Sequence, residues 1–156
     1  MTARRPGWLL LAGLTVTVIA LDHLTKWWAL RSLDDRDIDL VWTLRLNLTF
    51  NNGAAFGLGS RFAPLIAQAA LTLVIVVLGT SRTLGATLPR LGAAMVVGGA
   101  VGNLLDRFFR DGDGFLGGAV IDFIDLQWWP VFNLADSAIF VGAAVLALTA
   151  VEPERA

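Results

Sequence analysis

The stretch "FAPLIAQAALTLVIVVLGTS", residues 62–81, contains no charged side chain and is bounded by Arg61 and Arg82. A helix needs about 20 predominantly apolar residues to cross the hydrocarbon core of a bilayer. This stretch is 20 residues long, so it meets the length requirement without help from its flanks. It predicts a membrane-spanning helix, and the other uncharged intervals of the chain can be compared with it.

Three further uncharged intervals occur along the chain, at residues 6–21, 91–105 and 137–151. Each is shorter than a full span, and each reaches spanning length only if the aspartate at one end lies at the membrane edge. We therefore predict an all-α integral membrane protein, with residues 1–156 forming one membrane domain. Its four transmembrane helices are predicted near residues 7–30, 62–81, 90–108 and 133–151.

The composition supports a membrane protein and excludes several functions. Apolar residues make up 56% of the chain and charged residues only 16%, with a mean hydropathy of +0.67. The net charge of −1 provides no basic surface for nucleic acid. The chain has no cysteine and one histidine, so thiol nucleophiles are excluded and we expect neither a metal nor a cofactor.

Two longer connections join the predicted helices on the same side of the membrane. Residues 31–61 include "DIDLVWTLRLNLTF", which alternates apolar and polar residues as β-strands do. Residues 109–132 begin with a glycine-rich stretch. We expect a small β-like segment in the first connection. The first predicted helix could instead be a cleaved signal peptide, although no small-residue cleavage site follows it.

Five acidic residues are predicted to lie on the side of the membrane that carries these connections. They are Asp22, Asp106, Asp122, Asp125 and Asp136. An unpaired carboxylate in apolar surroundings costs several kcal/mol, so such acids usually have a function. Two adjacent carboxylates tend to share one proton, and the pair can then act as general base and general acid. This reasoning does not determine which two acids form the pair.

A short pattern occurs twice, as "GNLLD" at residues 102–106 and "FNLAD" at residues 132–136. In each, an asparagine and an aspartate three residues apart share one helix face. Asn133 could simply cap a helix whose first turn holds Asp136. Asp106 weakens that explanation, because it would meet the negative end of the helix dipole, although Arg107 beside it could pair with it and compensate.

Two other polar motifs have both structural and functional interpretations. In "DHLTK", Asp22 and Lys26 lie one helical turn apart and could form an ion pair. Lys26 is the only lysine, so a Ser–Lys protease would have to use it, but no serine lies in a recognisable nucleophile motif. In "NNGAAF", Asn51 and Gly53 could form a turn or hold an extended peptide.

The chain resembles bacterial lipoprotein signal peptidases, also called signal peptidase II. Five motifs occur in the family's order: "DHLTK", "NNGAAF", "GNLLDR", "VIDFID" and "FNLAD". The resemblance implies an inner-membrane aspartic endopeptidase that removes the signal peptide before a diacylglyceryl-modified cysteine. It also implies that both termini are cytoplasmic and the active site extracytoplasmic. The distribution of Lys and Arg, by contrast, leaves the orientation undecided.

The resemblance further implies residue roles. Asp122 and Asp136 correspond to the family's catalytic aspartates. The positions expected to bind or orient substrate are Asp22, Lys26, Asn51, Gly53, Asn103, Asp106, Arg107 and Asn133. The expected partners are diacylglyceryl prolipoproteins and membrane lipid, with no obligate protein partner.

Two other classes of protein remain as alternatives. Membrane carboxylates often mark ion pathways, so a small transporter or proton-conducting subunit is one of them. The clustering of the acids at one edge of the predicted spans argues against it. A purely structural membrane subunit is the other, but it would leave the acidic cluster unexplained.

Overall fold

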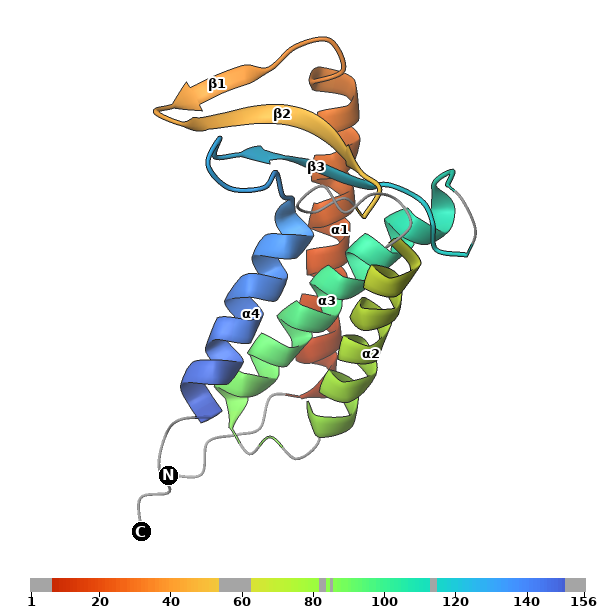
Figure 1. Cartoon of the computed structure of the whole chain (residues 1–156). Coiled ribbons are helices and arrows are strands. Elements are labelled where there is room, and N and C mark those ends of the chain that lie inside the picture. The colour runs from red at the N-terminus through yellow and green to blue at the C-terminus, as the bar shows by residue number, and fades with distance from the viewer. Residues whose placement is uncertain (1–6, 54–62, 82–83, 85, 113–114, 151–156) are drawn as a thin grey trace.

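The computed structural model of the protein describes residues 7–53, 63–81, 84, 86–112 and 115–150. Within these ranges the side chains of residues 63–68 and 80–81 are not described. The described residues form a helical bundle with a small sheet at one end (Figure 1). The bundle comprises α1 (Trp8–Ser32), α2 (Ala63–Ser81), α3 (Thr87–Phe109) and α4 (Leu134–Ala150). Each coincides with one predicted helix to within three residues at either end.

Helix α3 lies in the middle of the bundle and packs against each of the other three helices. Glycines permit this close approach. A Cβ atom on Gly142 would overlap the carbonyl oxygen of Gly92, and one on Gly99 would overlap that of Ala135. The backbones of α3 and α4 are therefore in direct contact where these glycines lie.

A three-stranded antiparallel sheet covers the end of the bundle opposite the start of α1 (Figure 1). Its strands are β1 (Ile38–Val41), β2 (Leu44–Asn51) and β3 (Val120–Asp125), in the order β1-β2-β3. The first two strands fall in the segment predicted to be β-like. The third was not predicted, because "VIDFID" is too apolar to alternate visibly and pairs with a strand about 70 residues earlier.

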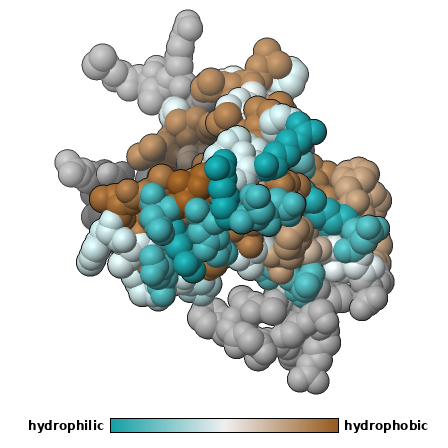
Figure 2. All heavy atoms as spheres, turned by 90° about the horizontal axis from the view of Figure 1, so that it is seen from above, coloured by the Kyte–Doolittle hydropathy of each residue, from teal (hydrophilic) through white to brown (hydrophobic). Residues whose placement is uncertain are grey.

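The sheet is fastened to the bundle by apolar side chains. Ile121 and Phe123 of β3 form a buried cluster with Ala29 and Leu33 at the end of α1. Because side chains alternate along a strand, Asp122 points to the opposite face of β3. Viewed onto this end, hydrophilic side chains form a band across the molecule, with hydrophobic ones beside it (Figure 2).

Two of the four helices, α1 and α3, are long and apolar enough to cross a membrane. Within the described residues, the apolar stretches of α2 and α4 are shorter, at Ala69–Gly79 and Leu134–Ala150. Much of the surface of α1 is apolar and exposed, including Leu9 and Val16. Such exposure suits a helix surrounded by lipid.

Candidate active site

The Asp122 carboxylate lies on β3 and is held by two asparagines. Asn51, at the end of the neighbouring strand β2, donates from Nδ2 to Asp122 Oδ2 at 2.9 Å. Asn133 donates from Nδ2 to Asp122 Oδ1 at 2.7 Å. The backbone N–H of Gly53, whose φ of 84° suits glycine, donates to Asn51 Oδ1 at 2.9 Å. This contact fixes the Asn51 amide with its NH₂ group toward Asp122.

Asp136 lies in the first turn of α4 and forms a reciprocal cap with Asn133. The N–H of Asp136 donates to Asn133 Oδ1 at 2.9 Å, and the N–H of Asn133 donates to Asp136 Oδ2 at 3.2 Å. These bonds satisfy backbone donors that the start of a helix would otherwise leave free. The capping interpretation of Asn133 and Asp136 is therefore correct, and it does not compete with a functional one.

Asn133 connects the two carboxylates. Its side chain is fully buried and contacts Asp122, while its backbone and amide oxygen hold Asp136. Asp122 is only 1% exposed. Burial, reinforced by the negative charge of Asp136, raises the pKa of Asp122 to about 7, although the bonds from Asn51 and Asn133 oppose this shift. The site therefore contains a carboxyl group that is still partly protonated near neutral pH, beside a second carboxyl group.

Lys26 is at the centre of a second group of polar residues beneath the pair. Its ammonium group lies 2.7 Å from Asp22 Oδ2 and 2.8 Å from Asp106 Oδ2, and its side chain is 1% exposed. It also donates to Asn103 Oδ1 at 2.9 Å, and Asn103 Nδ2 donates to Asp136 Oδ1 at 2.8 Å. The positive charge of Lys26 thus orients the amide that contacts Asp136.

Asp22 connects α1 to the start of α4. Its Oδ1 accepts the backbone N–H of Ala135 at 3.0 Å, a contact across 113 residues of sequence. A Cβ on Gly102 would lie 2.8 Å from Asp22 Oδ2, so only glycine leaves enough room here for the buried carboxylate and its ion pair. The predicted Asp22–Lys26 ion pair is present, but Asp22 also fixes the helix that carries Asp136.

Asp106 and Arg107 do not form the ion pair that their adjacency suggested. Besides contacting Lys26, Asp106 accepts from Arg110 Nε at 2.9 Å. The Arg107 guanidinium donates instead to the carbonyl oxygen of Gly118 at 3.4 Å. Because adjacent side chains on a helix point about 100° apart, Asp106 pairs with the arginine one turn later.

A cavity of about 200 Å³ adjoins the Asp136 carboxylate. Asn51, Asn103, Arg107 and Asp136 provide its polar lining. Its apolar lining comprises Ala70 of α2, Ala100 and Leu104 of α3, Val120 of β3 and Ile139 of α4. The cavity therefore offers hydrogen-bonding groups from three elements, β2, α3 and α4, next to an apolar wall.

Asp125 is separated from the pair although it is close in sequence. It accepts from Arg45 Nε of β2 at 2.7 Å and from the N–H of Gln127 at 2.6 Å. Across the described parts of the chain, no three His, Cys, Asp or Glu side chains are grouped so as to hold a metal ion.

Sequence reasoning missed two contributors to the site. Arg110 was assigned no role, although its position four residues after Asp106 in "DRFFR" was a usable signal. The backbone N–H of Ala135 left no sequence signal, since any residue except proline carries this donor.

Comparison with known proteins identifies the family. A family model described as "Signal peptidase (SPase) II" matches residues 14–152. The chain belongs to the signal peptidase II family.

Similar proteins are consistent with this assignment. A lipoprotein signal peptidase of Rhodococcus jostii is 42% identical over 94% of this chain and 76% of its own length. One of Syntrophomonas wolfei is 42% identical over 86% of this chain and 87% of its own. A solved bacterial membrane enzyme superposes with a TM-score of 0.81 at 20% identity, over 100% of this chain and 99% of its own, and supports the fold.

Signal peptidase II enzymes are membrane-bound aspartic endopeptidases that act on prolipoproteins. Membership of the family therefore makes this chain a membrane hydrolase, as the five motifs predicted. It also excludes the transporter and the structural subunit that the acidic cluster had left as alternatives.

Proposed function

We propose that Asp122 and Asp136 are the catalytic pair of a signal peptidase II that cleaves before a diacylglyceryl-modified cysteine. The observation that carries this assignment is the bridging asparagine: Asn133 binds Asp122 through its side chain and caps the turn that holds Asp136. Of the five candidate acids, Asp22 and Asp106 are paired with Lys26 and Asp125 with Arg45. Asp122 and Asp136 are thus the two that remain for general acid–base chemistry.

The surroundings favour a resting state in which Asp122 carries the proton. Its pKa of about 7 keeps it largely neutral below that pH. Asp136 lies in the first turn of α4, where the helix dipole favours a negative charge. It also accepts from Asn103, whose amide is polarised by Lys26. One neutral and one ionised carboxyl are what a general acid–base pair requires.

In the proposed mechanism, Asp136 takes a proton from a water molecule. The oxygen of that water attacks the scissile carbonyl carbon. Asp122 donates its proton to the carbonyl oxygen, and a tetrahedral intermediate forms. The intermediate then collapses when its oxygen returns a proton to Asp122 and Asp136 passes its proton to the cysteine nitrogen. The C–N bond breaks, and both carboxyl groups regain their starting states.

The remaining polar residues bind or orient in this scheme. Asn51, supported by Gly53, holds Asp122 and borders the cavity, so it can also contact a substrate backbone. Arg107 lines the same cavity, where its other N–H groups can bind a substrate carbonyl oxygen. Asp22, Lys26 and Asp106 act indirectly by fixing Asn103 and the start of α4.

We place all four helices across the inner membrane, with both termini cytoplasmic and the sheet outside. The starts of α1 and α3 and the ends of α2 and α4 lie at the end of the bundle remote from the sheet (Figure 1). The apolar wall of the cavity, which includes Ala70 and Ile139, would receive the signal peptide laterally from the bilayer. Membrane lipid and a diacylglyceryl prolipoprotein are then the only partners required.

Cleavage of a purified precursor tests the proposal. The full chain is incubated with a prolipoprotein that does or does not carry the diacylglyceryl group. Asp122→Asn and Asp136→Asn should each lower kcat by at least about 10³-fold, because each removes a proton-transfer group. Only the lipidated precursor should be cleaved efficiently.

The matched control is Asp125→Asn, which changes a buried carboxylate on the same strand as Asp122. It should stay within about threefold of wild-type activity, because Asp125 binds Arg45 and Gln127 rather than the pair. Full activity of either Asp122→Asn or Asp136→Asn would refute the assigned pair. Equal cleavage of both precursors would refute the proposed specificity.

A further inference from the structure

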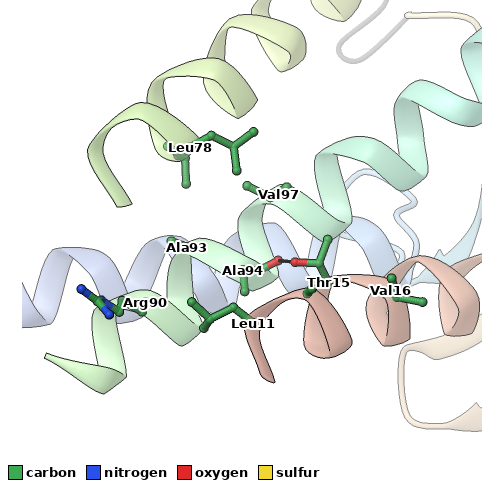
Figure 3. Close-up of a pocket in the computed structure, with 10 residues that line it drawn as sticks. Leu11, Thr15, Val16, Leu78, Arg90, Ala93, Ala94 and Val97 are labelled. Carbon is green, nitrogen blue, oxygen red and sulfur yellow. Dashed lines mark hydrogen bonds between the residues drawn. The ribbon is translucent and has the colours of Figure 1, made fainter. Parts of the chain in front are cut away.

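A second cavity, of about 360 Å³, lies at the end of the bundle remote from the sheet. It is a groove between α1 and α2 with α3 as its floor (Figure 3). Leu11 and Val16 come from α1 and Leu78 from α2, while Ala93 and Val97 belong to α3. The volume is within the range of small-molecule sites. Its innermost residue on α3, Val97, lies one helical turn before Ala100 of the cavity beside Asp136.

The interior of this groove suits a hydrocarbon chain. Ala93, Ala94 and Val97 form a buried floor of small side chains. The hydroxyl of Thr15, the polar side chain within the groove, donates to the carbonyl oxygen of Ala94 at 3.2 Å (Figure 3). With this hydroxyl already bonded, the interior offers little to a polar ligand.

Arg90 provides one charge at the end of the groove. Its Nε donates to the carbonyl oxygen of Leu84 at 2.8 Å, which fixes the side chain beside the apolar floor. The guanidinium has four further N–H donors, a geometry that matches a phosphate group. Among the described lining residues there is no acidic side chain to neutralise it. The sequence between α2 and Arg90 also contains Arg82 and no acidic residue.

The apolar interior and the arginine at its end together indicate which kind of ligand the groove can bind. A signal peptide has a positively charged N-terminal region, which Arg90 would repel. A neutral or zwitterionic lipid gains less from the arginine than an anionic one does. We propose that the groove binds an anionic phospholipid, with one acyl chain between α1 and α2 and the phosphate on Arg90. The site faces the leaflet opposite the one that borders the catalytic pair.

Lipid retention by the purified full chain tests this site. Native mass spectrometry would measure the binding of phosphatidylglycerol and of phosphatidylcholine with the same acyl chains. Wild type should bind phosphatidylglycerol about fivefold more tightly, since one interfacial arginine contributes about 1 kcal/mol to an anionic surface. Arg90→Gln should remove this preference, and Arg90→Lys should retain most of it. Filling the groove with Ala12→Leu should weaken the binding of both lipids.

Arg36→Gln is the matched control, because Arg36 also donates from Nε to a backbone carbonyl, that of Ser32 at 3.1 Å, but does not line the groove. It should leave the lipid preference unchanged. Equal binding of both lipids by wild type, or an unchanged preference in Arg90→Gln, would overturn the proposal. A higher KM of Arg90→Gln for prolipoprotein in phosphatidylcholine micelles would also overturn it, since that result would place the peptide in the groove.

Discussion

Replacement of Lys26 by Met is the most informative perturbation of the polar network. Met has nearly the same length and apolar volume as Lys but lacks the ammonium group that lies 2.7 Å from Asp22 and 2.8 Å from Asp106. It also cannot donate to Asn103 Oδ1. The substitution therefore removes a charge and three polar contacts with little change in packing.

The contacts that remain set the size of the expected effect. Breaking a buried ion pair from one side costs about 3–5 kcal/mol, because the other charge stays buried. Here Asp106 retains Arg110 at 2.9 Å, and Asp22 retains the N–H of Ala135 at 3.0 Å. Lys26→Met therefore leaves about one carboxylate's worth of negative charge without a partner, not two. We expect Lys26→Met to lower the free energy of unfolding by about 3 kcal/mol, the lower end of that range.

The assay is denaturant-induced unfolding in mixed micelles of four proteins: wild type, Lys26→Met, Asp22→Asn and the double variant. The double variant should be more stable than Lys26→Met alone, since Asp22→Asn removes the carboxylate left without its partner. A destabilisation of Lys26→Met below about 1 kcal/mol, or a double variant that is simply additive, would refute the reasoning. The first result would mean that the ammonium group contributes little net stability, and the second that its contribution does not depend on Asp22.

Two further predictions follow from the same geometry. The kcat/KM for prolipoprotein should fall above about pH 7 as Asp122 loses its proton. Asn51→Leu should move this fall to higher pH, because the hydrogen bond from Asn51 lowers the pKa of Asp122. A pH–rate profile that is the same in Asn51→Leu and wild type would contradict this. Gly99→Ala should lower the free energy of unfolding by about 1–3 kcal/mol, because its Cβ would overlap the carbonyl oxygen of Ala135. Gly13→Ala, which meets nothing within 4 Å, should leave stability within about 1 kcal/mol of wild type, and equal losses in the two variants would exclude close packing as the cause.

The sequence by itself determined the helices and most of the polar residues of the candidate site. Uncharged intervals predicted all four helices, because the absence of charge over such a length is a local property that needs no partner. Alternation predicted β1 and β2 for the same reason. The spacing of Asn133 and Asp136 predicted a cap, and the spacing of Asp22 and Lys26 an ion pair, since both contacts lie within one helical turn.

Only the tertiary structure decided how these residues are connected. It placed β3 beside β2, with Thr49 opposite Asp122, and this register brings Asn51 to the Asp122 carboxylate. It also placed Lys26 between Asp22 of its own helix and Asp106 of α3. The physical reason is distance along the chain, because these partners are about 70 or more residues apart. Local sequence patterns cannot predict contacts over such a separation. These residues meet because glycines of α3 allow close packing against α1 and α4, and because β3 pairs with β2.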